Sequence, residues 1–128
     1  MAGRFPLYTD ADIHGPVVDA LIDAGWDVLR AIDALPEGTL DDVHFERAAR
    51  EGRVYVANDR RIEPIAHAWL RDGKAFRGLI CWPRAHYARM SAGDFLELFE
   101  ELARQENPFR YPVVHIKPSR NSGTPSTL

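Results

Sequence analysis

The chain has 128 residues, a formal net charge of −3 and one cysteine, Cys81. This length allows a single domain with a buried core, and one cysteine excludes an intrachain disulfide framework and a multi-cysteine zinc site. No apolar run is long enough to span a bilayer, and the N-terminus lacks the layout of a signal peptide. The sequence therefore predicts a cytoplasmic protein with no membrane association.

Acidic and basic residues are distributed unevenly along the chain. Residues 1–52 contain 11 acidic and 4 basic side chains, a balance of −7, whereas residues 53–89 contain 8 basic and 3 acidic side chains, a balance of +5. Composition bias is one explanation of this asymmetry. It is also expected where acidic side chains hold a cation beside a basic surface that meets a polyanion.

Apolar strand segments alternate with helical segments along the chain. In chain order the sequence predicts a strand at 5–9, a helix at 16–24, a strand at 26–32, a helix at 40–49, a strand at 54–57, a helix at 63–70, a strand at 77–82, a helix at 92–104 and a strand at 111–116. This alternation predicts an α/β fold, a three-layer α/β/α sandwich with a mostly parallel five-stranded sheet. We expect one domain over residues 1–117 and a disordered tail over 118–128.

Carboxylates occupy the segments that follow two predicted strands and the start of one helix. Asp10 and Asp12 follow the first strand, Asp59 follows the third, and the second helix begins with Asp41 and Asp42. All these positions lie at the carboxyl edge of a parallel sheet, where open α/β folds bind ligands. Clustered carboxylates repel unless a cation intervenes, and oxygen ligands without His or Cys indicate Mg²⁺ or Mn²⁺. Such ions beside a basic surface suit phosphodiester hydrolysis.

Four further side chains are candidates for phosphate contact at this edge. Arg60 and Arg61 flank the predicted pocket, and Asn58 and His14 belong to its loops. Each also has a purely structural interpretation, because Asn58 with its neighbour Asp59 suits a turn and the arginines suit a solvated loop. The acids that open the second helix are likewise favoured there by the helix dipole.

Three motifs in order resemble the small PIN-like proteins of the DUF5615 type. They are Asp10-Ala11-Asp12 after a short strand, Leu40-Asp41-Asp42 at a helix start, and the run from Glu51 to Arg60. That group is similar to the PIN-domain nucleases, which include the VapC-type toxins and the Mut7-C domain. The resemblance extends over about residues 5–83.

The resemblance implies a PIN-like sandwich and a metal-dependent endoribonuclease with Asp10, Asp41 and Asp59 as catalytic residues. It also implies RNA as the substrate and an antitoxin protein as a partner, and homodimers are common for such folds. The chain departs from the family pattern at Arg61, where the family has a second Asp, and at Ala11, where Glu is common.

Asp12 or Asp42 could supply the charge that these departures remove. Otherwise Arg61 neutralises the pocket and leaves an inactive module that binds RNA or protein. An active nuclease would cleave RNA only with a divalent metal, whereas an inactive module would bind its partner even in EDTA.

A receiver domain of two-component signalling is a further alternative. It would use Asp59 as the phosphoacceptor, with Mg²⁺ on Asp10 and Asp12, and a lysine after the fifth strand, here Lys117. The fourth strand ends in Cys81-Trp82 where a receiver needs a hydroxyl, which argues against this alternative.

The remaining reactive side chains receive structural interpretations. His44, His67, His86 and His115 show no ligand spacing to one another, so we assign them no metal role. Cys81 lies in a buried strand segment with no nearby base in the sequence, so we expect an inert core residue.

Overall fold

The computed structural model describes residues 3–58, 61–83 and 90–116. In chain order its elements are β1 (Leu7–Thr9), α1 (Gly15–Asp23), β2 (Val28–Arg30), α2 (Ala31–Ala34), α3 (Asp41–Arg50), β3 (Val54–Ala57), α4 (Ile62–Arg71), β4 (Leu79–Cys81), α5 (Ala92–Arg104) and β5 (Val113–His115). The predictions made for Asp59, Arg60, His86 and the tail at 118–128 lie outside the described residues.

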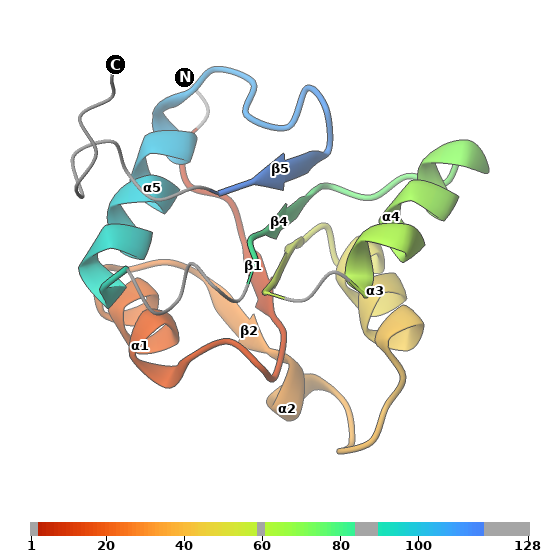
Figure 1. Ribbon diagram of the computed structural model, residues 1–128, viewed down its shortest axis with the longest axis horizontal. Coiled ribbons are helices and arrows are strands. Elements are labelled where there is room, and N and C mark those ends of the chain that lie inside the picture. The colour runs from red at the N-terminus through yellow and green to blue at the C-terminus, as the bar shows by residue number, and fades with distance from the viewer. Residues whose placement is uncertain (1–2, 59–60, 84–89, 117–128) are drawn as a thin grey trace.

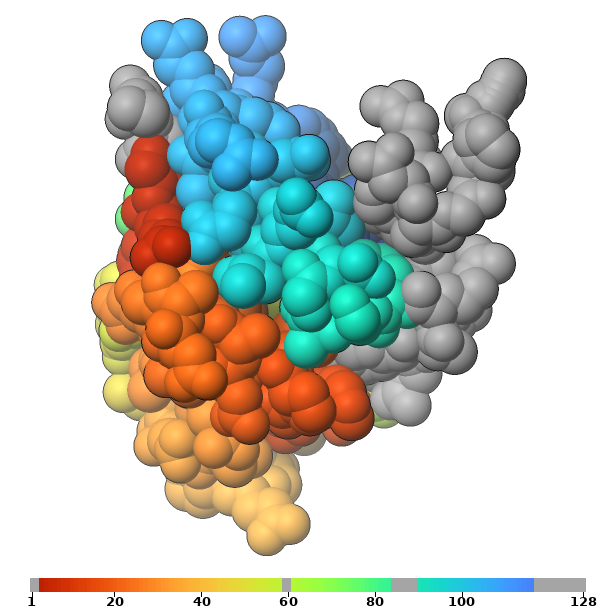
Figure 2. Space-filling view, turned by 90° about the vertical axis from the view of Figure 1, so that its left-hand side faces the viewer, coloured from red at the N-terminus to blue at the C-terminus, as the bar shows by residue number. Residues whose placement is uncertain are grey.

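The five strands form one sheet in the order β2-β1-β3-β4-β5 (Figure 1). All four pairs of neighbouring strands are parallel. Helices α1 and α5 cover one face of this sheet and α3 and α4 cover the other, which makes three layers. Figure 2 shows α1 and α5 packed side by side. The predicted α/β class and sandwich architecture are therefore confirmed.

Strand β3 shows why the central strands are unbroken apolar runs in the sequence. Successive side chains of a strand point to opposite faces of the sheet. Val54 and Val56 belong to the core beneath α1 and α5, whereas Tyr55 and Ala57 belong to the core beneath α3 and α4. Because both faces are covered, both carry mainly apolar side chains, as is usual for parallel sheets.

The predicted second strand, 26–32, is too long. Only Val28–Arg30 pair with β1, whose three residues lie opposite them, and the chain turns into the short helix α2 at Ala31. An edge strand can be no longer than the neighbour to which it is hydrogen-bonded. Apolar residues beyond that point, such as the exposed Ile32, do not extend it.

The last helix, α5, begins with a capping box. The Ser91 hydroxyl accepts a hydrogen bond from the Asp94 amide, and the Asp94 carboxylate accepts one from the Ser91 amide. Asp thus replaces the more common Glu or Gln in this motif. Across the described ranges, none of the helices is long and apolar enough to cross a membrane.

Candidate functional site at the carboxyl edge of the sheet

Open α/β sheets bind ligands in the crevice where the strand order reverses, and in this sheet that position lies between β1 and β3. The chain runs from β1 to β2 on one side of it and then crosses to β3 on the other side, so the carboxyl ends of β1 and β3 form the topological switch point. Asp10 directly follows β1 and Asn58 directly follows β3. The Asp10 amide also donates to the Val56 carbonyl at 2.9 Å, which ties the two strand ends together.

Asp10 accepts a hydrogen bond from the hydroxyl of Tyr55, and the negative charge of Asp41 acts on the same phenol. The Oδ1 atom of Asp10 accepts hydrogen bonds from the Ala11 amide at 2.9 Å and from the Tyr55 hydroxyl at 3.4 Å. Burial raises the pKa of Tyr55, and the negative charges of Asp10 and Asp41 raise it further. The phenol therefore remains protonated at neutral pH and acts as a donor to the acidic site.

A buried pair of side chains fixes the start of α3 against β1. The Tyr8 ring stacks on Tyr55 with centroids 5.4 Å apart, and its hydroxyl lies 2.6 Å from Nδ1 of His44. Burial lowers the pKa of His44, which Asp41 partly opposes, and burial raises the pKa of Tyr8. With both groups neutral, one hydrogen bond joins them and holds the first turn of α3, which carries Asp41, against β1.

The other predicted site residues differ in their exposure. Asp12 and Asp42 are exposed, as is His14. Asn58 is buried, and its amide donates to the backbone carbonyl of Asp12 at 3.4 Å. Asn58 therefore joins the loops that follow β1 and β3. The sequence alone did not distinguish this structural role from RNA contact.

Two buried oxygen atoms at this edge have no hydrogen-bond partner among the described residues. They are Oγ1 of Thr9, whose residue is 1% exposed, and Oδ1 of Asn58, whose residue is 3% exposed. A small hollow of about 30 Å³ lies beside Thr9 and Asp10, which is enough for a water molecule. Arg30, at the end of β2, also lines this hollow, although sequence analysis did not single it out.

Part of the basic segment lies at the opposite edge of the sheet. Arg53 precedes β3 and pairs with Asp27 at 3.0 Å and Glu51 at 3.1 Å. Arg77 precedes β4 and donates to the Gly52 carbonyl at 3.3 Å. These arginines stabilise the amino edge, so the charge excess of residues 53–89 does not form one surface beside the acids. Arg61, by contrast, is exposed at the start of α4 on the carboxyl edge.

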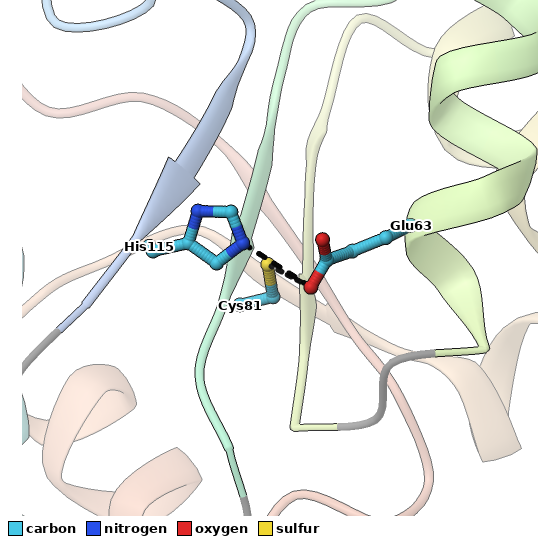
Figure 3. Close-up of side chains that lie close together, drawn as sticks. All are labelled: Glu63, Cys81 and His115. Atoms are coloured by element: carbon cyan, nitrogen blue, oxygen red, sulfur yellow. Dashed lines mark hydrogen bonds and ion pairs between the residues drawn. The ribbon is translucent and has the colours of Figure 1, made fainter.

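A second cluster lies further along the carboxyl edge (Figure 3). The Oε2 atom of Glu63 lies 3.6 Å from Sγ of Cys81 and 3.2 Å from Nε2 of His115. The sequence-based expectation that Cys81 has no base nearby is wrong, because the ends of β4 and β5 become neighbours only in the folded sheet. Burial raises the pKa of the Cys81 thiol to about 12, and the Glu63 carboxylate adds to the rise, so the metal-free cysteine is not an activated nucleophile.

Comparison with known proteins identifies no relative, because no family model, curated protein or solved structure matches this chain. The resemblance to PIN-like proteins stays a prediction, and the function is argued from geometry.

Proposed function

We propose that this chain is a Mg²⁺- or Mn²⁺-dependent endoribonuclease whose site is the crevice between β1 and β3. The observation that carries the proposal is that Asp10, directly after β1, bonds the Tyr55 hydroxyl, while the charge of Asp41, at the start of α3, acts on the same phenol. Asp59, which follows Asn58, completes the proposed set of catalytic carboxylates. An antitoxin partner and homodimer formation follow from the resemblance alone and belong to the same proposal.

The donor atoms of the crevice suit a hard cation. Carboxylates of Asp10 and Asp41 supply charged oxygens, and the unpartnered oxygens of Thr9 and Asn58 supply neutral ones that can bind water of a hydrated ion. Mg²⁺ keeps several waters and uses one or two protein carboxylates, so it does not require a complete protein cage. Exposed Asp12, in the loop after β1, and exposed Asp42, in the first turn of α3, can add charge.

The bound ion would activate a water molecule and neutralise charge that develops on the phosphate. The protein groups orient that chemistry. Tyr55 and the Ala11 amide fix the Asp10 carboxylate, while the Tyr8–His44 bond fixes the helix that carries Asp41. Arg30 and Arg61, on the two sides of the crevice, are placed to contact phosphates of the substrate.

A receiver-type phosphoacceptor is the second candidate. Its support is the strand order β2-β1-β3-β4-β5, which receiver domains share. Against it, β4 ends in buried Cys81 and Trp82, neither of which offers the hydroxyl that a receiver uses. Incubation with a small-molecule phosphodonor and Mg²⁺ separates the candidates, since a receiver gains the mass of one phosphoryl group and a nuclease does not.

The deciding experiment is cleavage of mixed single-stranded RNA by the full chain with Mn²⁺ or Mg²⁺. We expect cleavage that EDTA abolishes and that falls at least about a hundredfold in Asp10→Asn, Asp41→Asn and Asp59→Asn, the scale of losing one charge-stabilising group. Asp23→Asn, an exposed acid at the far end of α1, is the matched control and should retain full activity.

Circular dichroism of each variant separates loss of chemistry from loss of fold. A folded wild type that cleaves no RNA with either ion would overturn the nuclease proposal. RNA binding that survives EDTA, without cleavage, would establish the inactive binding module instead. Cleavage that persists equally in Asp10→Asn and Asp41→Asn would remove the crevice as the site.

A further inference from the structure

Three side chains with different metal-ligating atoms converge at the ends of β4 and β5. Cys81 and His115 are the last residues of these strands and lie directly opposite each other in the parallel register. Residues opposite each other in neighbouring strands point to the same face of the sheet. Glu63, in the first turn of α4, extends over that face toward both (Figure 3).

Two of the three distances between the ligand atoms match the edges of a tetrahedral metal site. Nε2 of His115 and Sγ of Cys81 lie 3.2 Å and 3.6 Å from the same Glu63 oxygen, and the three atoms lie within 4.8 Å of one another. With metal–ligand distances of about 2.0 Å for oxygen and nitrogen and about 2.3 Å for sulfur, tetrahedral edges are about 3.3 Å for N···O and about 3.5 Å for S···O. A metal ion therefore needs only small side-chain shifts to reach all three atoms.

The ligand types select the class of metal. Thiolate and imidazole ligands favour zinc and related transition metals, whereas Mg²⁺ and Ca²⁺ prefer oxygen ligands alone. One carboxylate, one thiolate and one imidazole make three protein ligands, the number found in zinc sites that keep one coordination position open.

An open hollow gives access to the cluster. It measures about 460 Å³ and is lined by Glu63, Pro64, His67, Pro83 and His115. Glu63 and His115, which carry two of the three ligand atoms, line it; the side chain of His115 is half-exposed at 49%, whereas Cys81 is buried. The remaining coordination position thus faces a space large enough for water or a small anion.

We propose that Glu63, Cys81 and His115 bind one divalent transition metal of the zinc class, with the fourth coordination position open to this hollow. The proposal does not rest on the ribonuclease site, whose ligands come from the ends of β1 and β3 and the start of α3. Metal binding here removes the thiol proton of Cys81 and forms the metal–sulfur bond, so affinity falls as the pH is lowered.

The test is titration of the purified, reduced full chain with Zn²⁺ against a chelating dye, and with Co²⁺ followed by absorbance. We expect one bound Zn²⁺ per chain and a thiolate-to-cobalt charge-transfer band, which can arise only from Cys81 because the chain has one cysteine. The band should vanish in Cys81→Ala, and Zn²⁺ affinity should fall at least about tenfold in His115→Gln and Glu63→Gln. Glu46→Gln, an exposed acid of α3, is the matched control.

His115→Gln keeps the test valid if Cys81→Ala disturbs the core, because the exposed His115 can change without repacking. Absence of stoichiometric Zn²⁺, a cobalt spectrum without the sulfur band, or equal affinity in the folded His115→Gln variant would each overturn the proposal. His67 is not within the ligand distance of the cluster, so His67→Gln should retain the affinity. If His67→Gln loses as much Zn²⁺ affinity as His115→Gln, the claim that the fourth coordination position is open is overturned.

Discussion

The buried bond between Tyr8 and His44 gives the sharpest prediction about the crevice. Tyr8→Phe removes the hydroxyl that lies 2.6 Å from Nδ1 of His44, in a pair whose residues are 0% and 8% exposed. The imidazole then keeps a buried nitrogen without its hydrogen-bond partner, which costs about 1–3 kcal/mol. We expect the free energy of unfolding to fall by that amount at pH 7.5.

Urea denaturation followed by circular dichroism measures this change. Tyr111→Phe is the matched control, because Tyr111 is 58% exposed and its change should stay within about 0.5 kcal/mol. The slope of the free energy against urea should be the same for all three proteins, since the surface exposed on unfolding is nearly unchanged.

The same pair predicts a pH dependence. Because burial lowers the pKa of His44, the unfolded chain, whose histidine titrates near about 6.5, binds this proton more tightly than the folded protein. The contribution of His44 is fully present above about pH 6.5 and is lost as the pH falls toward the lowered folded value. His44→Gln should therefore lose less stability than the wild type between neutral and mildly acidic pH.

Two results would refute this reasoning. One is a Tyr8→Phe variant as stable as the wild type, and the other is an identical acid dependence in His44→Gln. If Tyr8→Phe is destabilised but binds Mn²⁺ as tightly as the wild type, the bond stabilises the fold and does not position Asp41.

Two further predictions separate packing and charge at the edges of the sheet. Gly78→Ala places a Cβ atom 2.5 Å from the Phe109 ring and should destabilise by about 1–3 kcal/mol in urea denaturation, whereas Gly93→Ala, in helix α5 and 3.7 Å from its nearest neighbour, should be neutral or stabilising. Equal changes in stability for the two variants would contradict the close approach of the Phe109 ring to Gly78. In RNA binding at varied salt, Arg61→Ala should weaken affinity and reduce the salt dependence, while Arg53→Ala, at the amino edge, should leave both unchanged. An effect of Arg53→Ala as large as that of Arg61→Ala would show that RNA does not bind at the carboxyl edge.

Local signals in the sequence were sufficient to locate each described element except the short helix α2. Helix α5 was predictable because Ser91 and Asp94 satisfy its first amides within four residues, and Gly25 and Gly52 end helices α1 and α3 with positive φ angles of 97° and 68°. The end of β2 was not predictable, because it depends on the length of β1, its hydrogen-bonded neighbour.

The candidate site divides in the same way. The alternation of strands and helices predicts a parallel sheet whose strands all end at one edge, so Asp10 and Asp41 could be named from the sequence. Tyr55, Tyr8 and His44 could not, because their roles depend on which face of a strand or helix meets its neighbour.

The sequence by itself determined the alternation of elements, their apolar faces and the carboxylates that follow them, because these depend on residues close together in the chain. Only the tertiary structure decided which distant side chains meet. Glu63, Cys81 and His115 show no ligand spacing along the chain, yet the parallel register of β4 with β5 places two of them opposite each other and α4 brings the third. Strand order and register, which depend on the whole sheet, set such contacts.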